Sequence, residues 1–402
     1  MNRDNGGVRV LYSFPHKLGA DRICYTAWQQ VNGIAAAGGD LLVFPGGVTR
    51  PVPGGVKVKT TLGRGKIRVP YKVLGSMRAF ALHDWIVSRR LERMAGKVDI
   101  VHTWPLGALR TLKMAAKLGI PTVLERPNAH TRFAYEVVDR ECRRLGVILP
   151  SEHEHAYNEE VLRIEEMEYR EAYRLLCPSD FVVRTFVEQG CNREKLVRHQ
   201  YGFDESVYYP SLRPVVPNAG LKMLYVGGCA PRKGLHYALE AWLQSPARET
   251  GSFLIAGEFV PSYADKLTPM LADPSVKVLG FRNDVSELMR ESDVLVLPTI
   301  EEGSALVTHE ARGCGCVLLV SDAAGAICQH MDNALVHPVG DVNALAVHIT
   351  MLDANRSLLT RLRSASLSTV AEISWTSAGR RLLGVYRETI AKYAEDHRIG
   401  RD

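Results

Sequence analysis

The sequence predicts an α/β fold in which two doubly wound parallel sheets, one in each half of the chain, face each other across a cleft. Three observations lead to this prediction. The chain has 402 residues, and chains of this length usually divide into two domains. Short apolar strands alternate with helical patterns, which is the order of parallel βαβ units. The strands of the second half end at Gly or Pro, where such sheets carry their ligand-binding loops.

The first half opens with a β-loop-α unit: residues 8–13 read as a strand, 15–19 as a turn and 25–37 as a helix. Further short apolar strands are predicted in this half over residues 40–44, 99–102 and 121–124. Charges then recur at helical spacing over residues 152–174, and residues 175–179 form a strand and the cap of a new helix. This alternation predicts a doubly wound first domain.

Residues 210–220 contain three prolines and read as a hinge. The strands predicted after it cover residues 221–228, 252–257, 276–280 and 293–298. We therefore predict a first Rossmann-like domain over residues 1–206 and a second over 220–378. The last helix, over residues 380–400, is expected to pack back on the first domain.

The composition is that of an ordinary globular protein, with 46% hydrophobic and 23% charged residues. The first five residues are polar, and no apolar run approaches the roughly 20 residues of a membrane-spanning helix. We therefore expect a cytoplasmic protein. The eight cysteines are scattered and include no C-x-x-C pair, so we expect reduced thiols and no metal site built from them.

The net charge of +6 is unevenly distributed, because residues 51–100 contain 11 Lys and Arg against three Asp and Glu. Within this region, residues 71–94 interleave apolar and basic side chains. Such a segment could lie on the inner face of a membrane. The commoner alternative is a core helix with a solvated basic face. A phosphate-bearing acceptor is another partner for this charge, whereas we expect no nucleic acid partner.

Two loops that leave strands of the second half carry residue types suited to binding a ligand. Residues 227–234 place Gly227 and Gly228 at a strand end, and Arg232 and Lys233 at the start of a helix. Glycines let a backbone approach phosphates, a helix N-terminus offers free N–H groups, and the cations add charge. The pattern is weak alone, since strand-Gly-helix turns are also common for packing.

The second loop carries Glu302 before a small-residue turn and Glu310 within the next helix. One carboxylate could accept hydrogen bonds from sugar hydroxyls and the other from a ribose diol. From the spacing alone, the commoner explanation is an acidic preference near a helix N-terminus.

Together these two stretches resemble the donor-site signature of retaining glycosyltransferase family four, the group 1 glycosyltransferases, which have the GT-B fold. Residues 178–182, 201–204 and 373–375 resemble the family as well. The resemblance implies that Lys233 holds the donor diphosphate, Glu310 the ribose hydroxyls and Glu302 the transferred sugar. It also implies that Leu306 and Val307 offer backbone N–H groups.

Two positions depart from the family pattern. The arginine that commonly follows the first glycine of the phosphate loop is replaced by Gly228, and Arg232 is a candidate substitute. The phenylalanine and glycine usual after Glu-Gly are Ser304 and Ala305, which alters the expected shape of the sugar pocket.

Loops of the first half are expected to bind the acceptor and to complete the catalytic site. His16, Lys17 and Gly19 follow the first strand, and His102 follows a later one. In the family, the loop equivalent to residues 125–130 often carries a histidine that touches the sugar; here both Arg126 and His130 are candidates. Each histidine also has a structural explanation as a hydrogen-bonded core residue.

These features predict a retaining glycosyltransferase that uses a UDP-, GDP- or dTDP-sugar to build a bacterial surface polysaccharide or glycoconjugate. The acceptor would be a glycan, a lipid-linked sugar or a small molecule. No Asp-x-Asp pair stands in a suitable place, so we expect neither a metal nor a cofactor. The alternatives are a nucleotide-sugar epimerase and a non-catalytic partner subunit of the same fold. A dinucleotide oxidoreductase is disfavoured because G-x-G-x-x-G is absent.

Overall fold

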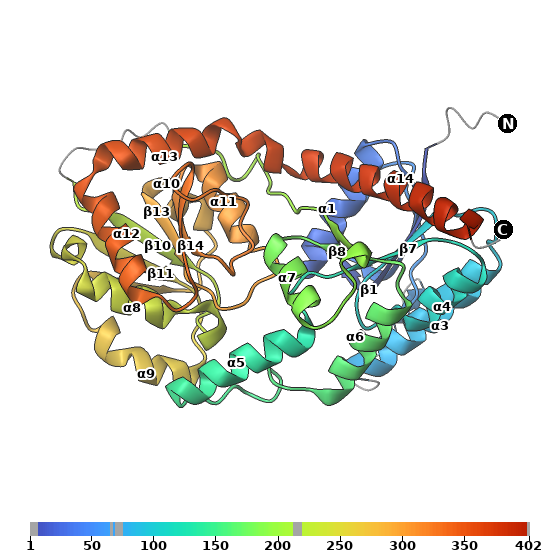
Figure 1. Ribbon diagram of the computed structural model, residues 1–402, viewed down its shortest axis with the longest axis horizontal. Helices are drawn as coiled ribbons and strands as arrows, with labels where there is room; N and C mark the ends of the chain where they lie inside the picture. The colour runs from blue at the N-terminus through green and yellow to red at the C-terminus, as the bar shows by residue number, and fades with distance from the viewer. Residues whose placement is uncertain (1–6, 65–66, 69–74, 212–218, 400–402) are drawn as a thin grey trace.

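The computed structural model describes residues 7–64, 67–68, 75–211 and 219–399. Within them the chain forms two parallel sheets, each covered by helices on both faces (Figure 1). Three of the predicted regions fall wholly or partly outside the described residues. These are the polar start, residues 71–74 of the predicted basic segment 71–94, and most of the predicted hinge 210–220. The two sheets follow one another along the chain, as the sequence predicts.

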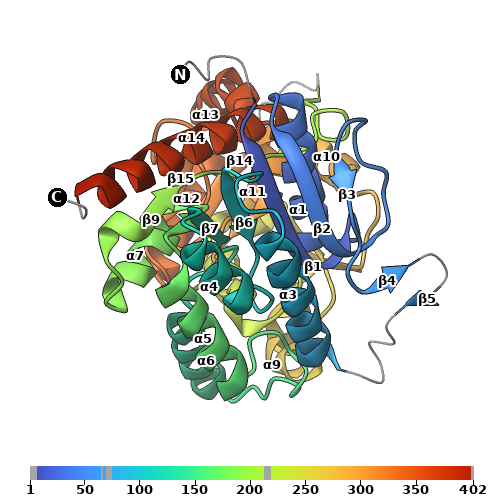
Figure 2. The ribbon, with the colours of Figure 1, turned by 90° about the vertical axis from the view of Figure 1, so that its right-hand side faces the viewer.

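The first sheet has the strand order β3-β2-β1-β6-β7-β8-β9, and every neighbouring pair is parallel. Its strands are β1 (Arg9–Leu18), β2 (Asp40–Val48), β3 (Lys57–Val58), β6 (Ile100–Thr103), β7 (Thr122–Glu125), β8 (Arg174–Cys177) and β9 (Leu196–Arg198). The helices of this half are α1 (Ile23–Ala36), α3 (Ser76–Glu92), α4 (Leu109–Lys117), α5 (Thr131–Leu145), α6 (Glu159–Glu171) and α7 (Asp180–Glu188). A small hairpin of β4 (Gly63–Arg64) and β5 (Ile67–Arg68) projects from it (Figure 2).

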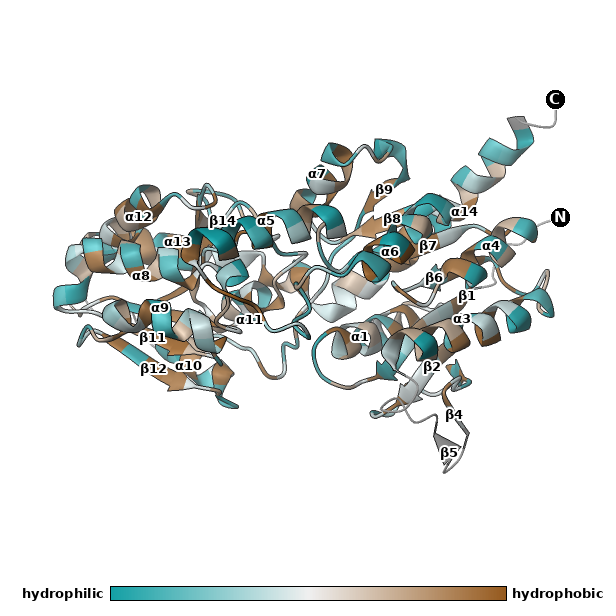
Figure 3. Ribbon diagram, turned by 90° about the horizontal axis from the view of Figure 1, so that it is seen from below, coloured by the Kyte–Doolittle hydropathy of each residue, from teal (hydrophilic) through white to brown (hydrophobic). Residues whose placement is uncertain are grey.

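Alternate residues of β1 pack on opposite faces of the sheet, because side chains of a strand point alternately to either side. Val10 and Tyr12 belong to the cluster formed with α1 and α14, whereas Leu11 belongs to the cluster formed with α3 and α4. A strand buried on both faces must be apolar throughout, which explains the short continuous apolar runs in the sequence. The helices, by contrast, carry both teal and brown in Figure 3, as amphipathic helices do.

The second sheet has the order β12-β11-β10-β13-β14-β15 and is also parallel. Its strands are β10 (Lys222–Val226), β11 (Ser252–Ala256), β12 (Val276–Gly280), β13 (Val294–Leu297), β14 (Val317–Ser321) and β15 (Ala334–His337). Its helices are α8 (Leu235–Gln244), α9 (Pro261–Leu271), α10 (Val285–Glu291), α11 (Leu306–Cys314), α12 (Val342–Ala354) and α13 (Arg356–Ser368). One large apolar cluster joins this sheet to its helices.

The last helix, α14 (Trp375–Ile399), leaves the second half and runs along the first (Figure 1). It packs against α1, and its Leu382, Leu383 and Tyr386 are buried in the core of the first sheet. Where the chain crosses between the halves, Phe203 and Ser374 form a parallel β-bridge. The two crossing segments are therefore paired with each other.

The predicted turn at residues 15–19 is wrong, because β1 continues to Leu18. The strand keeps pairing with β2 through a register shift between Phe14 and Lys17. Such an irregularity lets a strand accommodate a residue like Pro15, which cannot donate a backbone hydrogen bond. The turn begins instead at Gly19, whose φ of 87° is readily adopted by glycine.

Candidate active site

The turn between β10 and α8 requires glycine at its end. Gly234 has a φ of 67°, and a Cβ atom there would lie 2.0 Å from the carbonyl oxygen of Pro298. No other residue tolerates both the left-handed backbone and this approach. Gly228 differs: it is exposed, and a Cβ atom would have nothing within 4 Å. The turn therefore leaves room for a side chain at the position where the family pattern has arginine.

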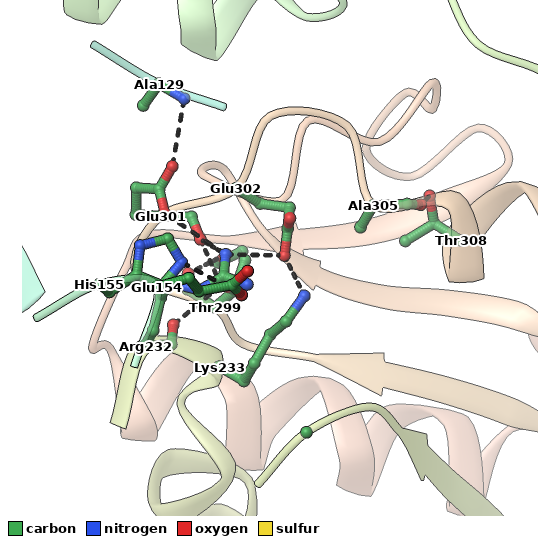
Figure 4. Close-up of polar contacts among 12 residues, drawn as sticks. Ala129, Glu154, His155, Arg232, Lys233, Thr299, Glu301, Glu302, Ala305 and Thr308 are labelled. Atoms are coloured by element: carbon green, nitrogen blue, oxygen red, sulfur yellow. Dashed lines mark hydrogen bonds and ion pairs between the residues drawn. The ribbon is translucent and has the colours of Figure 1, made fainter. Parts of the chain in front are cut away.

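The two cations of this turn point at the loop that follows β13, as Figure 4 shows. Arg232 Nη1 donates to the carbonyl oxygen of Glu301 over 2.8 Å and to Glu302 Oε2 over 3.1 Å. Lys233 Nζ contacts the same Glu302 oxygen. The structure thus brings together Arg232, Lys233 and Glu302, three residues that the sequence singled out.

Burial and the cations act on the two adjacent carboxylates differently. Burial raises the pKa of Glu302, but Arg232 and Lys233 outweigh it and lower that pKa below its ordinary value. At Glu301, which is fully buried, desolvation prevails and raises the pKa. Burial also lowers the pKa of Lys233. Glu302 is therefore the carboxylate held ionised beside the cations.

The first turn of α11 offers backbone N–H groups beside this site. The helix begins at Leu306 after Ala305, whose side chain does not cap it, and its first turn contains no acidic residue. Leu306 and Val307, the two predicted N–H donors, lie at this N-terminus. A helix N-terminus with free N–H groups carries a partial positive charge and favours an anion.

Glu310 lies one turn further along α11, in different surroundings from Glu302. Its carboxylate hydrogen-bonds with the hydroxyl of Tyr208, a residue just after the crossing between the halves. Burial raises the pKa of Glu310 to about 7. The two glutamates are therefore separated: one is paired with cations, and the other is a desolvated carboxyl next to a phenol.

The two halves are in contact at this site. The backbone N–H of Ala129, in the loop after β7, donates to Glu301 Oε1 over 3.2 Å. A Cβ atom on Gly303 would lie 1.6 Å from the carbonyl oxygen of Pro127, so the loops touch at a glycine. Glu141 on α5 also accepts a 2.8 Å hydrogen bond from Tyr237 on α8. The expected cleft is thus closed around the cations, and a cavity of about 480 Å³ remains between α5, α7 and the second half.

Arg126 does not face this site. It is 2% exposed, pairs with Glu165 over 3.2 Å and lies over the ring of Tyr169. His130 is also buried; its Nδ1 accepts the N–H of Arg132 and thereby caps α5. The prediction that one of these side chains contacts the sugar is corrected for Arg126, because its guanidinium is bound inside the first half. The contact that this loop makes with the second half comes from its backbone, where Ala129 N–H donates to Glu301.

His102, which was expected to contact the acceptor, is not accessible to a ligand. It is fully buried within β6, and its Nδ1 lies 2.6 Å from the hydroxyl of Tyr386 on α14. His16 is half-buried and packs edge-on against Phe80, and burial lowers its pKa to about 4. Lys17 is exposed, and Gly19 is buried beside Arg50. Of the predicted acceptor-side residues, His102 is therefore excluded by its burial.

Sequence reasoning missed a buried polar cluster around Glu125. This carboxylate is fully buried and accepts hydrogen bonds from Gln30, His199 and Tyr201, while His102 Nε2 lies 3.5 Å away. The two histidines, despite the cost of burial, hold the pKa of Glu125 far below its ordinary range. An acidic residue that ends an apolar strand was the available signal. Glu301 was missed too, although it stands directly before Glu302.

Among the described residues, no group of three or more His, Cys, Asp or Glu side chains is arranged to hold a metal ion. In the same part of the chain, no helix combines the length and apolarity needed to cross a membrane. All eight cysteines are free thiols.

Comparison with known proteins supports the reading of the second half. Residues 220–355 match the family model described as "Glycosyl transferases group 1". The lipopolysaccharide glucosyltransferase WaaG of Escherichia coli K12 is 26% identical over 213 residues, which are 52% of this chain and 51% of WaaG. The putative colanic acid biosynthesis glycosyltransferase WcaL of Salmonella typhimurium is 25% identical over 51% of this chain and 55% of WcaL. The chain thus spans about half the length of the curated relatives it matches.

Solved structures extend the likeness to the whole fold. Sucrose-phosphate synthase from Thermosynechococcus elongatus superposes with a TM-score of 0.67 at 18% identity, over 96% of this chain and 100% of the synthase. Anabaena Alr3699/HepE in complex with UDP and glucose gives 0.63 at 16% identity, over 95% and 100%. Together with the two parallel sheets, these likenesses confirm the predicted GT-B fold.

Proposed function

Residues 220–355 of this chain are a group 1 glycosyl transferase domain, and on that premise we propose that the protein is a retaining glycosyltransferase. It moves a sugar from a nucleotide-sugar donor to an acceptor hydroxyl. The observation that carries the proposal is the meeting of Arg232, Lys233 and Glu302 in one nearly closed site. Cations there suit a departing diphosphate, and the carboxylate suits sugar hydroxyls and positive charge on the reacting carbon.

In the proposed reaction, the bond between the anomeric carbon and the donor diphosphate breaks, and its electron pair leaves with the phosphate oxygen. The acceptor hydroxyl attacks the same face of the sugar, and its proton passes to the departing diphosphate. Arg232, Lys233 and the N-terminus of α11 stabilise the negative charge as it develops. No protein nucleophile and no metal ion is needed for these steps.

The acceptor is proposed to be a growing surface glycan, because WaaG acts on lipopolysaccharide and a second relative is named for transfer to a diphospho-undecaprenol sugar. UDP-sugars are the first donors to test, since Alr3699/HepE was crystallised with UDP and with UDP-glucose. These assignments rest on the relatives rather than on residues of this chain.

The test of the proposed function is donor binding followed by turnover. Thermal-shift screening against UDP-, GDP- and dTDP-sugars should show stabilisation by one donor class. The Lys233→Ala variant should lose about 1.5–3 kcal/mol of affinity for that donor, because a charge-assisted phosphate contact is removed. Wild-type affinity in this variant would refute the role of the loop. Activity should survive EDTA, and the product should keep the donor's anomeric configuration by NMR.

The two glutamates should separate kinetically. Glu302→Gln removes charge beside the carbon that becomes cationic, so kcat should fall far more than nucleotide affinity. Glu310→Gln weakens ribose contacts present in ground and transition states alike, so KM and free-nucleotide affinity should change first. Equal loss of nucleotide affinity in both variants would contradict the separate roles. Conversion of a nucleotide-sugar into an isomer without acceptor would identify an epimerase instead.

We further propose that a basic groove of the first half rests on an anionic membrane surface. The groove has a volume of about 970 Å³ and is lined by Lys59, Trp85, Arg89, Arg90 and Arg93. Trp85, Arg89 and Arg90 belong to α3, the position of which is shown in Figure 2. Trp85 is 49% exposed, and an exposed indole among cations suits the interface of an anionic bilayer.

Co-sedimentation with vesicles tests this contact. Wild-type protein should bind vesicles that contain anionic phospholipid and should ignore neutral ones, with binding reduced by salt. Trp85→Ala and Arg89→Glu should weaken the binding, whereas Lys277→Glu, at an exposed position of β12, should not. Equal binding by all three variants would rule out this groove.

A further inference from the structure

The loop between α5 and α6 belongs to the first half, yet it reaches the cations of the second. Residues 150–157 fold into successive turns, in which His153 N–H donates to Pro150 and Ala156 N–H donates to His153. Glu154 and His155 lie beside Arg232 in Figure 4. The charges of the two halves also affect each other's pKa values. Glu154 raises the pKa of Arg232, whereas Arg232 and Lys233 lower the pKa of His155. The loop therefore faces the proposed diphosphate position from the opposite half.

His155 is held uncharged at this place. His155 is only 7% exposed. Its Nε2 lies 3.8 Å from Glu154 Oε1, which is too far for a hydrogen bond. Burial, followed by the fields of Arg232, His153 and Lys233, lowers the pKa of His155 far below its ordinary value. A buried neutral imidazole beside two cations can accept a proton once an anion neutralises those cations.

His153 packs beside His155, and the centroids of the two rings are 5.8 Å apart. Its Nδ1 accepts the backbone N–H of His155 over 3.2 Å, so in the neutral ring the proton is on Nε2. Burial lowers the pKa of His153, Glu154 raises it, and Arg232 and Arg22 lower it further. Arg22, just before α1, has a φ of 57° that places a non-glycine residue in the left-handed region. The two histidines of this loop thus lie together, and His155 lies beside the cations of the second half.

We propose that His153 and His155 form the first half's side of the donor diphosphate subsite, opposite Arg232 and Lys233. This inference rests on the proposed function and adds residues outside the family's donor signature. A diphosphate placed between the loops accepts hydrogen bonds from both halves. Its negative charge also favours protonated histidine, so donor binding draws protons onto this loop. The same contact ties donor binding to closure of the halves, because the loop can reach the phosphates only when they are together.

Binding is measured by calorimetry with whichever of UDP, GDP and dTDP binds the wild-type protein. His153→Ala should bind the nucleoside diphosphate roughly ten-fold more weakly, the loss expected of one contact to a charged group. The monophosphate of the same base should be affected less. His397→Gln, an exposed histidine of α14 remote from the loop, is the matched control and should bind as wild type.

Proton uptake separates a phosphate contact from a merely structural loop. His155→Gln keeps a polar side chain but cannot take a proton, so the number of protons bound with the ligand should be lower than in wild type. This count comes from calorimetry in buffers of different ionisation enthalpy, and other titrating groups cancel in the difference. Wild-type affinity and proton count in both histidine variants would overturn the inference, and would leave the proposed function intact if Lys233→Ala still binds weakly. Failure of wild-type protein to bind any nucleotide would overturn both.

Discussion

At the scale of single residues, Gly228 and Gly234 bracket the phosphate loop but tolerate side chains differently. Gly228→Arg should be accepted without loss of stability, because its Cβ position is open. The new cation should tighten nucleoside diphosphate binding by up to about ten-fold, as one added charge-assisted contact would. Isothermal titration of the variant against wild type measures this gain. Unchanged binding would mean that Arg232 already supplies the charge that arginine provides in the family, and weaker binding would contradict the expected phosphate contact.

Gly234→Ala is the opposite control in the same loop. Its Cβ would meet the Pro298 carbonyl oxygen in a left-handed backbone, so this variant should melt at a lower temperature.

The raised pKa of Glu310, about 7, predicts a pH dependence. A carboxylate accepts ribose hydroxyls best when ionised, so nucleotide affinity should rise as pH increases from 6 to 8, by at most about ten-fold per unit below the pKa. Stability should move the other way. Because the folded pKa lies above the unfolded value of 4.5, the contribution of Glu310 is complete below pH 4.5 and is lost as pH rises through 7. Binding titrations and urea unfolding at each pH measure the two trends, and Glu310→Gln should abolish both.

The sequence predicts a ligand-binding residue reliably only where the local sequence pattern alone determines the position of its side chain. Lys233 and Glu302 lie in loops after apolar strands, and their side chains are in contact in the structure. Arg126 follows the apolar strand β7 and His102 lies within the apolar strand β6, yet both side chains are buried. Their partners, Glu165 and Tyr386, are 39 and 284 residues away. Burial set by such distant partners is not visible in a local pattern.

At the scale of elements, α4 depends on a residue of another helix for its start. Its own N-cap position, Ala108, provides no side-chain hydrogen bond. Asp84 on α3 instead accepts the N–H groups of Arg110 and Thr111 over 2.6 and 2.9 Å. Asp84→Ala should therefore lower the free energy of unfolding by about 1–3 kcal/mol, because two backbone donors at the start of the helix, one of them buried, lose their acceptor.

Chemical denaturation measures this loss, with Glu92→Gln as the control on the same chain segment. Glu92 pairs with Arg89 at the surface, so its replacement should change stability by about 0.5 kcal/mol or less. If Asp84→Ala is as harmless as Glu92→Gln, α4 does not need the carboxylate.

Most strands near the site were predictable because a strand buried on both faces is apolar throughout. The short edge strands β3 and β9 were missed, since two or three residues carry no period. The apolar strands β14 and β15 of the second sheet were missed as well. The helix predicted over residues 152–174 begins only at Glu159, where Asn158 caps it. The charges before it belong to the histidine-bearing loop, and charge periodicity alone could not separate loop from helix.

At the scale of the whole molecule, the two halves are joined by two adjacent crossings. Gly202 lies against the second crossing, and a Cβ atom there would be 2.4 Å from the backbone nitrogen of Trp375. Gly202→Ala should therefore push the crossings apart, lower the melting temperature and reduce kcat by disturbing how the halves meet. Calorimetry and kinetics measure both effects.

Gly384, in the middle of α14, is the matched control because its Cβ position is empty. Gly384→Ala should stabilise the protein by about 0.5–1 kcal/mol through helix propensity and leave kcat unchanged. A Gly202→Ala variant that behaves like Gly384→Ala would mean that the crossing does not need its close approach.

The return of α14 to the first sheet also has a consequence during translation. Multidomain chains commonly fold from the N-terminus as they emerge from the ribosome. Here the core of the first sheet lacks Leu382, Leu383 and Tyr386 until the final helix is synthesised. All strands of the second sheet precede that helix. The nascent chain can therefore complete the strands of its second domain while the apolar core of its first domain still lacks these partners and stays open to solvent.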